Sequence, residues 1–188
     1  EYEKRKIPFD STFALAPSEL QIEDWLSIFA LTMTSSEGVL LQRVISTLQS
    51  YENFSLDDVQ NAISGDPLAE KQTKQILSSL FAISATWGIF STTEEGTKIS
   101  ELIKPKMATV LDISVYSSIA AFNVRALVIS LICRKIFTTR MDARKEEERE
   151  SLQYGQDYSS YKTERDNPLV WLFIDEAHEF LPREGKTP

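Results

Sequence analysis

The feature that most constrains the fold is a run of six apolar residues at 169–174, which is followed at once by Asp175 and Glu176. The run is too short for an ordinary helix, and its Val, Trp, Phe and Ile content favours a strand that is buried on both faces. Such strands belong to parallel sheets, in which ligands lie beyond the carboxyl ends of the strands. The sequence therefore predicts an α/β fold with a ligand site beside these two acids.

The two acids suit magnesium-dependent nucleotide hydrolysis. Mg²⁺ prefers oxygen ligands and keeps several waters, so Asp175 together with nucleotide phosphates can complete its shell. Because successive strand residues point to opposite faces, we expect Glu176 to face another part of the site, where it orients or deprotonates an attacking water. The alternative interpretation is structural: Asp175 caps a helix and Glu176 favours its first turn.

The composition narrows the class of protein. Acidic residues outnumber basic ones by 28 to 20, giving a net charge of −8. This balance argues against the chain holding nucleic acid by itself, since Lys and Arg make most phosphate contacts. The single cysteine, Cys133, excludes an intrachain disulfide and fits the reducing cytoplasm. No membrane span is expected, because Asn123 and Arg125 interrupt the longest apolar stretch.

The order of patterns predicts three parts. Residues 1–17 form an edge segment of the α/β core, residues 18–103 a mainly helical inserted subdomain, and residues 104–188 the rest of the core. Apolar spacing and capping residues, with Ser18 as the first N-cap, predict four helices in the subdomain, which are followed by a turn or hairpin at 88–96. The four helices cover residues 18–33, 37–50, 55–63 and 71–85.

The last part is expected to contain one right-handed βαβ crossover. Its elements are a strand over 107–113, a long helix over 116–141 with a charged extension, and the strand over 169–174. Asp112 lies within the first strand and is interpreted as structural. The apolar-poor residues that lead up to Asp166 are expected to form a loop.

A winged-helix DNA-binding module is an alternative for the helical subdomain. Its recognition helix would carry Lys71, Lys74 and Gln75, and its wing would lie near residues 89–96. Two lysines among so many acids make a poor DNA-reading face, so a plain helix bundle is favoured.

The segment from Leu172 to Pro182 reads Leu-Phe-Ile-Asp-Glu-Ala-His-Glu-Phe-Leu-Pro. It resembles the Walker B strand of the HerA/FtsK superfamily of RecA-like ATPases, particularly the HerA-type DNA translocases. The resemblance implies a partial RecA-like parallel sheet. It also implies that Asp175 coordinates Mg²⁺, that Glu176 is the catalytic base, and that His178 lines the site or relays the nucleotide state. Glu179 is a weaker candidate.

The same resemblance implies an ATP-hydrolysing translocase that acts in DNA-end processing. ATP and Mg²⁺ would be its cofactors, DNA its substrate, and a nuclease of the NurA type its partner, in a homo-hexamer. The chain has no Walker A loop, because Phe180 stands where Gly185-Lys186-Thr187 would need a preceding glycine. We therefore expect a central fragment that is inactive alone. The alternatives are a DEAH-type helicase fragment, or a non-catalytic helical module that binds proteins.

Overall fold

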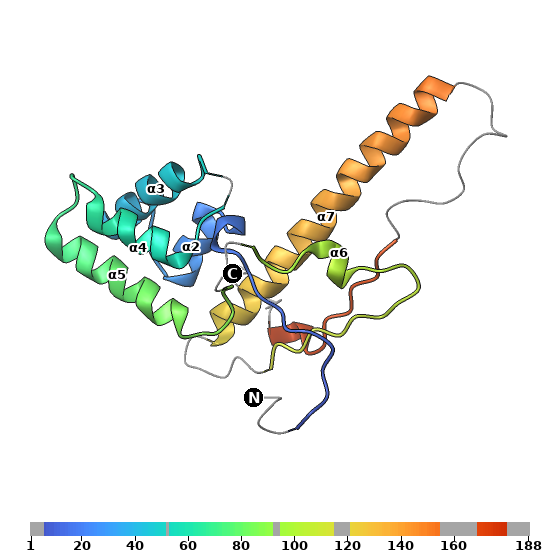
Figure 1. Ribbon diagram of the computed structural model, residues 1–188, viewed down its shortest axis with the longest axis horizontal. Helices are drawn as coiled ribbons and strands as arrows, with labels where there is room; N and C mark the ends of the chain where they lie inside the picture. Colours follow the sequence, from blue (N-terminus) through green and yellow to red (C-terminus); the bar gives the residue numbers. More distant parts are fainter. Residues whose placement is uncertain (1–5, 52, 92–94, 115–120, 155–168, 180–188) are drawn as a thin grey trace. The chain divides into compact units, whose positions relative to one another are not determined.

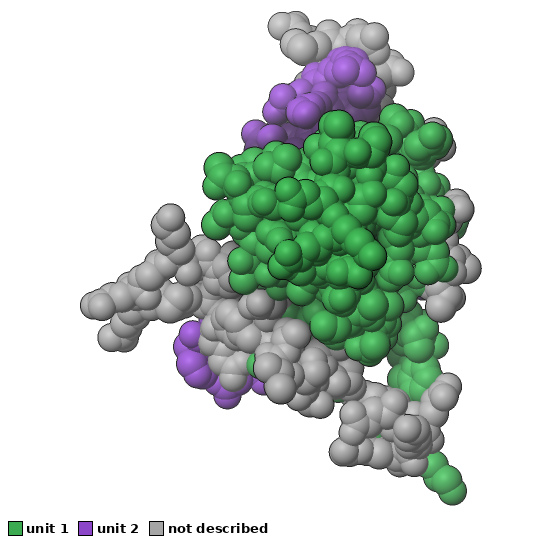
Figure 2. All heavy atoms as spheres, turned by 90° about the vertical axis from the view of Figure 1, so that its left-hand side faces the viewer, with its two compact units in different colours: residues 1–97, 111–127, 188 green, residues 98–110, 128–187 purple. Residues whose placement is uncertain are grey.

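The computed structural model of the chain describes residues 6–51, 53–91, 95–114, 121–154 and 169–179 (Figure 1). These residues divide between two compact units, the first comprising residues 1–97, 111–127 and 188, and the second residues 98–110 and 128–187 (Figure 2). In chain order the helices are η1 (Pro17–Glu19), α2 (Ile22–Ile28), α3 (Ser36–Leu48), α4 (Leu56–Gly65), α5 (Lys71–Ala85), α6 (Ile99–Leu102), α7 (Ala121–Tyr154) and η3 (Ala177–Glu179).

The predicted RecA-like parallel sheet is wrong for the part of the chain that the structure describes. Residues 107–113 and 169–174 contain no strand, so the expected βαβ crossover is not formed there. The physical reason is that a strand needs neighbouring strands for its backbone and covering layers for its faces. Here Val110 is 91% exposed and Phe173 86% exposed. The apolar pattern predicted a buried environment that the described residues do not provide.

The helical character of the subdomain is confirmed, and three of its four helices have nearly the predicted bounds. Helix α4 begins after the expected Ser55, and the Ser35 side chain caps α3, whereas the N-cap of α5, Glu70, makes no side-chain cap bond. The Ser35 hydroxyl accepts the backbone N–H of Gly38 at 3.0 Å. At α4, Ser55 and Asp58 form a capping box, in which the Asp58 carboxylate accepts the Ser55 N–H at 2.8 Å. The Ser55 hydroxyl also donates to this carboxylate, at 2.6 Å, and these two hydrogen bonds lower the pKa of Asp58.

The first predicted helix is shorter than expected, and Ser18 is not its N-cap. Pro17 starts the 3₁₀ helix η1, and α2 follows with Gln21 as its N-cap. The backbone N–H of Gln21 donates to Asp24 at 2.8 Å. Beyond α2, Ala30 adopts a left-handed conformation with φ 52°. Such a residue commonly follows a helix C-terminus, so the helix ends here although the apolar pattern of the sequence continues.

The core of the first unit, which contains α2 to α5 and is called the helical unit below, is built around Trp25, which is completely buried. Its ring stacks on Phe29 and Phe90, with centroids 5.7 and 5.4 Å away, and lies tilted against Phe81 at 4.9 Å. Helices α3, α4 and α5 all contact one another, and α2 contacts α3 (Figure 1). The other large, fully buried side chains of this unit are Leu15, Leu20, Leu40, Leu41, Ile45, Phe54, Ile63, Leu77 and Ile89.

The chain before α2 is tied to the chain after α5 by short backbone pairing. The Leu15 N–H donates to the carbonyl of Ile89, and the Ser91 N–H donates to the carbonyl of Leu15, both at 2.8 Å. A Cβ added at Gly96 would lie 2.5 Å from the backbone nitrogen of Ala16, so this approach requires glycine. Within the segment predicted as an edge of the α/β core, only Leu15 forms an isolated parallel bridge, and its partner is Phe90 of the predicted helical subdomain.

The long helix predicted over 116–141 is confirmed from residue 121 as α7, which continues through the charged extension to Tyr154, while positions 116–120 lie outside the described residues. Its first half buries four apolar residues, Val124, Leu127, Val128 and Leu131. Its second half carries ion pairs, including Arg140 to Glu147 at 2.8 Å and Arg144 to Glu148 at 3.1 Å. Cys133 is only half-buried, and burial raises the pKa of its thiol. The loop predicted after this helix lies outside the described residues from position 155.

None of the helices in the described ranges combines the length and apolar character that crossing a bilayer demands.

Candidate functional site

The candidate site lies at the end of the apolar segment 169–174. This segment is neither helix nor strand, and most of its large side chains are open to solvent. Trp171 is 83% exposed and Leu172 50% exposed, whereas Ile174 is partly buried. The two acids that follow are both exposed, so their carboxylates are accessible to a ligand.

The backbone turns sharply at the acid pair. The Glu176 N–H donates to Oδ1 of Asp175 at 3.0 Å, and Glu176 itself has a left-handed conformation with φ 51°. A non-glycine residue in this region is uncommon and carries backbone strain. The 3₁₀ helix η3 follows directly. The alternative interpretation, in which Asp175 caps a helix, therefore holds only in part. Asp175 accepts the N–H of its neighbour just before the three-residue helix η3, but it caps no α-helix.

The turn brings the only histidine of the chain back to the second acid. Nδ1 of His178 lies 3.1 Å from Oε2 of Glu176. Both side chains remain largely exposed, at 77% for His178 and 68% for Glu176. The structure therefore places two of the predicted site residues in direct contact. Asp175 is joined to Glu176 through the backbone hydrogen bond.

The donor set fits a magnesium ion that is shared with a phosphate ligand. Within the described ranges, no group of three or more His, Cys, Asp or Glu side chains could hold a metal. One carboxylate is nevertheless enough for Mg²⁺ when phosphates and waters supply the other oxygens. Asp175 accepts its backbone hydrogen bond through Oδ1, which leaves Oδ2 open to a cation. The described residues thus offer Mg²⁺ an exposed carboxylate at Asp175, while the rest of its shell would have to come from other groups.

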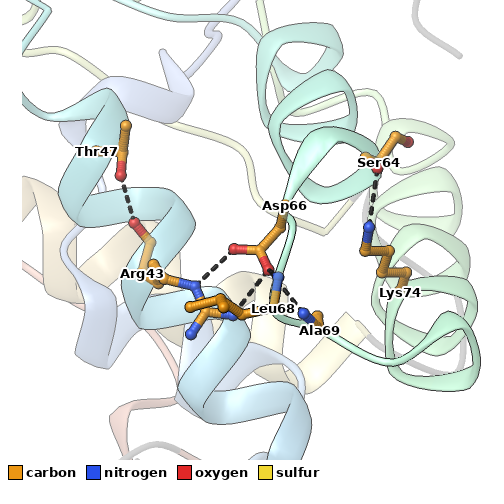
Figure 3. A network of polar contacts seen from close by, with 7 residues as sticks. All are labelled: Arg43, Thr47, Ser64, Asp66, Leu68, Ala69 and Lys74. Atoms are coloured by element: carbon orange, nitrogen blue, oxygen red, sulfur yellow. Dashed lines mark hydrogen bonds and ion pairs between the residues drawn. The ribbon is translucent and has the colours of Figure 1, made fainter.

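The other residues singled out from the sequence lie elsewhere or outside the described side chains. Asp112 is exposed and accepts the N–H of Ser114 at 2.8 Å, which is a local turn contact. Lys74, expected on a DNA-reading face under the winged-helix alternative, donates instead to the carbonyl of Ser64 at 3.0 Å (Figure 3). Lys71 and Gln75 are exposed on α5. The side chain of Glu179 and the Gly185-Lys186-Thr187 motif fall outside the described part.

Sequence reasoning missed a second polar cluster, at the junction of α3 with the α4–α5 connection (Figure 3). The Arg43 guanidinium donates to both carboxylate oxygens of Asp66, at 2.6 and 2.9 Å. The same carboxylate accepts the N–H groups of Leu68 and Ala69, both at 2.9 Å. The Arg43 side chain holds the pKa of Asp66 at about 2, and the two backbone bonds also lower it. The Asp-Pro pair after Gly65 signalled a turn, but nothing local pointed to Arg43, 23 residues earlier.

This second cluster joins α3 to the connection between α4 and α5. The Asp66 carboxylate is well enclosed, with only 6% of its side chain exposed. Its oxygens are occupied by the guanidinium and by two backbone donors, so they are not available to a ligand. The candidate functional site therefore remains the acid pair at 175–176.

Comparison with known proteins returned no matching family model, no similar curated protein and no similar solved structure.

Proposed function

We propose that this chain is part of an ATP-hydrolysing DNA translocase of the HerA type, with Asp175 and Glu176 as its hydrolytic acids. The observation that carries the proposal is the acid pair itself. It follows a six-residue apolar segment, precedes Ala-His and an aromatic-aliphatic-Pro tail, and presents both carboxylates to solvent. This combination suits nucleotide hydrolysis better than it suits helix capping, because no α-helix begins at Asp175.

The chemistry assigns one task to each acid. Asp175 would hold Mg²⁺ through its open oxygen, and the metal would supply charge neutralisation at the phosphates of ATP. Glu176 would orient the attacking water and accept the proton that this water loses. The two acids lie next to each other in one turn, where Glu176 has a left-handed backbone.

The partners in the proposal come from the resemblance alone. They are DNA, other copies of the subunit in a hexamer, and a nuclease of the NurA type. The 188 residues contain no Walker A motif, so the gene sequence around them offers a direct test. A Gly-x-x-x-x-Gly-Lys-Ser/Thr motif after an apolar run in the encoded protein supports the ATPase. A gene product without any such motif would contradict it.

The enzymatic test uses the protein as its gene encodes it. We expect Glu176→Gln to reduce ATP turnover at least about 100-fold while leaving ATP binding intact, because the general base alone is removed. Asp175→Asn should reduce Mg²⁺-dependent binding as well. Glu23→Gln, at an exposed acid on α2, is the matched control and should turn over ATP normally. Unchanged hydrolysis by Glu176→Gln would refute the assigned role, and stimulation by RNA instead of DNA would favour a DEAH-type helicase.

A second candidate function is protein binding by the helical unit. The observation behind it is an exposed apolar pair on α5, Ile76 and Ile83, which are 41% and 55% exposed and share one helix face. If the chain works by binding a protein, the double variant Ile76→Ser, Ile83→Ser should abolish the protein's activity in the cell, whereas Glu176→Gln should leave that activity intact. The opposite result supports the translocase.

A further inference from the structure

Three features of the turn after the apolar segment act on one side chain. The Asp175 carboxylate accepts the N–H of Glu176, the left-handed φ of 51° redirects Glu176, and η3 carries His178 round to it. Nδ1 of His178 lies 3.1 Å from Oε2 of Glu176, a contact that is an ion pair when the imidazole is protonated. No other described element is needed for this arrangement.

We propose that His178 is a positioning residue for Glu176, a role that rests on the proposed function. A neutral imidazole that donates from Nδ1 to Oε2 leaves Oε1 of the carboxylate free to accept a proton from water. An exposed glutamate without such a bond samples several staggered rotamers, and only some of them direct an oxygen toward the water. His178 would therefore raise the fraction of time for which the base is correctly placed.

The donor is specific to one ring nitrogen, which allows a conservative rescue. The side-chain amide nitrogen of asparagine is at the same number of bonds from the backbone as Nδ1 of histidine. His178→Asn can therefore supply the proposed hydrogen bond to Glu176, whereas His178→Ala cannot. A role in sensing the nucleotide, or in lining the site through Nε2, would not be rescued by asparagine.

The first experiment needs no nucleotide and uses the 188-residue chain. His178 is its only histidine, so ¹⁵N-labelled imidazole gives one unambiguous pair of NMR signals. At about pH 8.5, above the ordinary titration range of imidazole, we expect the wild-type chain to show a larger Nδ1–H tautomer fraction than Glu176→Ala. Identical tautomer populations in the two proteins would overturn the proposal.

The second experiment measures ATPase kinetics in the protein as its gene encodes it. We expect His178→Ala to lower kcat about tenfold with KM for ATP changed by less than about twofold, and His178→Asn to recover most of kcat. Unaltered kcat in His178→Ala, while Glu176→Gln is inactive, would overturn the positioning role and leave the proposed function standing. Normal turnover by Glu176→Gln would instead overturn the proposed function, whatever the NMR result.

Discussion

Two tryptophans of this chain have opposite environments, although both lie in apolar stretches of sequence. Trp25 is completely buried among Phe29, Phe81 and Phe90, whereas Trp171 is 83% exposed. Around Trp25 the apolar residues recur at helical spacing in helices that contact one another, so each helix covers the apolar face of its neighbours. Around Trp171 the apolar residues are consecutive, and the described residues do not cover them. A local pattern is thus sufficient for folding only where the covering elements are close in the chain.

Replacing each tryptophan in turn gives the largest expected contrast. Trp25→Ala should lower the free energy of unfolding by about 3–5 kcal/mol, because it removes a fully buried aromatic side chain and leaves a cavity. Trp171→Ala should change it by less than about 0.5 kcal/mol. Urea denaturation followed by circular dichroism measures both. Equal losses for the two variants would show that the segment at 169–174 is as well packed as the helical core.

The Arg43–Asp66 cluster should have the next largest effect. Asp66→Ala removes the acceptor of two guanidinium hydrogen bonds and of the N–H groups of Leu68 and Ala69, and we expect a loss of about 2–3 kcal/mol in the free energy of unfolding. Asp57→Ala, at an exposed acid in the first turn of α4, is the control and should cost about 0.5 kcal/mol. A loss in Asp66→Ala no larger than in the control would contradict the structural role of the cluster.

The same carboxylate predicts an acid-sensitive step in stability. The pKa of Asp66 is about 2 in the folded chain, against about 3.9 for an unperturbed aspartate. Because the folded value is the lower one, the stabilisation is fully present above about pH 4 and is lost as the pH falls toward 2. Asp66→Asn should remove this part of the pH dependence. Denaturation midpoints between pH 2 and 5 measure it, and parallel curves for the two proteins would contradict the assignment.

The contrast between the regions around Trp25 and Trp171 also separates what the sequence predicts correctly from what it does not. The limits of α4 were predicted from Ser55 and Gly65, because caps and stops act within a few residues, and α3 and α5 were predicted from the helical spacing of their apolar residues. The strand predicted at 169–174 does not form among the described residues, because its covering layers would have to come from distant residues. At the candidate site, Asp175 and Glu176 were predicted from residue type and order and His178 from the family resemblance, and their roles stay predictions. The left-handed backbone at Glu176 and its contact with His178 carried no sequence signal.

Two glycines in neighbouring helices give a smaller contrast. A Cβ added at Gly38 would lie 2.0 Å from the carbonyl oxygen of Thr32, whereas one added at Gly65 meets nothing within 4 Å. Gly38→Ala should therefore destabilise the helical unit by about 1–3 kcal/mol through forced backbone shifts. Gly65→Ala should be neutral or stabilise it by up to about 1 kcal/mol. Thermal unfolding of both variants tests this, and equal midpoints would mean that the loop before α3 yields without cost.

The smallest effect on stability is expected at two non-glycine residues with left-handed backbones. They are Ala30, which follows α2, and Glu176, which lies in the turn of the acid pair. Ala30 has φ 52° and Glu176 has φ 51°, so glycine should relieve similar local strain at either position. Ala30→Gly acts within the packed helical unit and should raise the free energy of unfolding by about 1 kcal/mol, because the strain is released in the cooperatively folded part. Glu176→Gly should leave the unfolding midpoint unchanged, because relief of strain in an exposed turn adds nothing to a transition that the turn does not share. Denaturant curves for the two variants measure this difference, and a comparable rise in both would show that the acid turn unfolds together with the helical core.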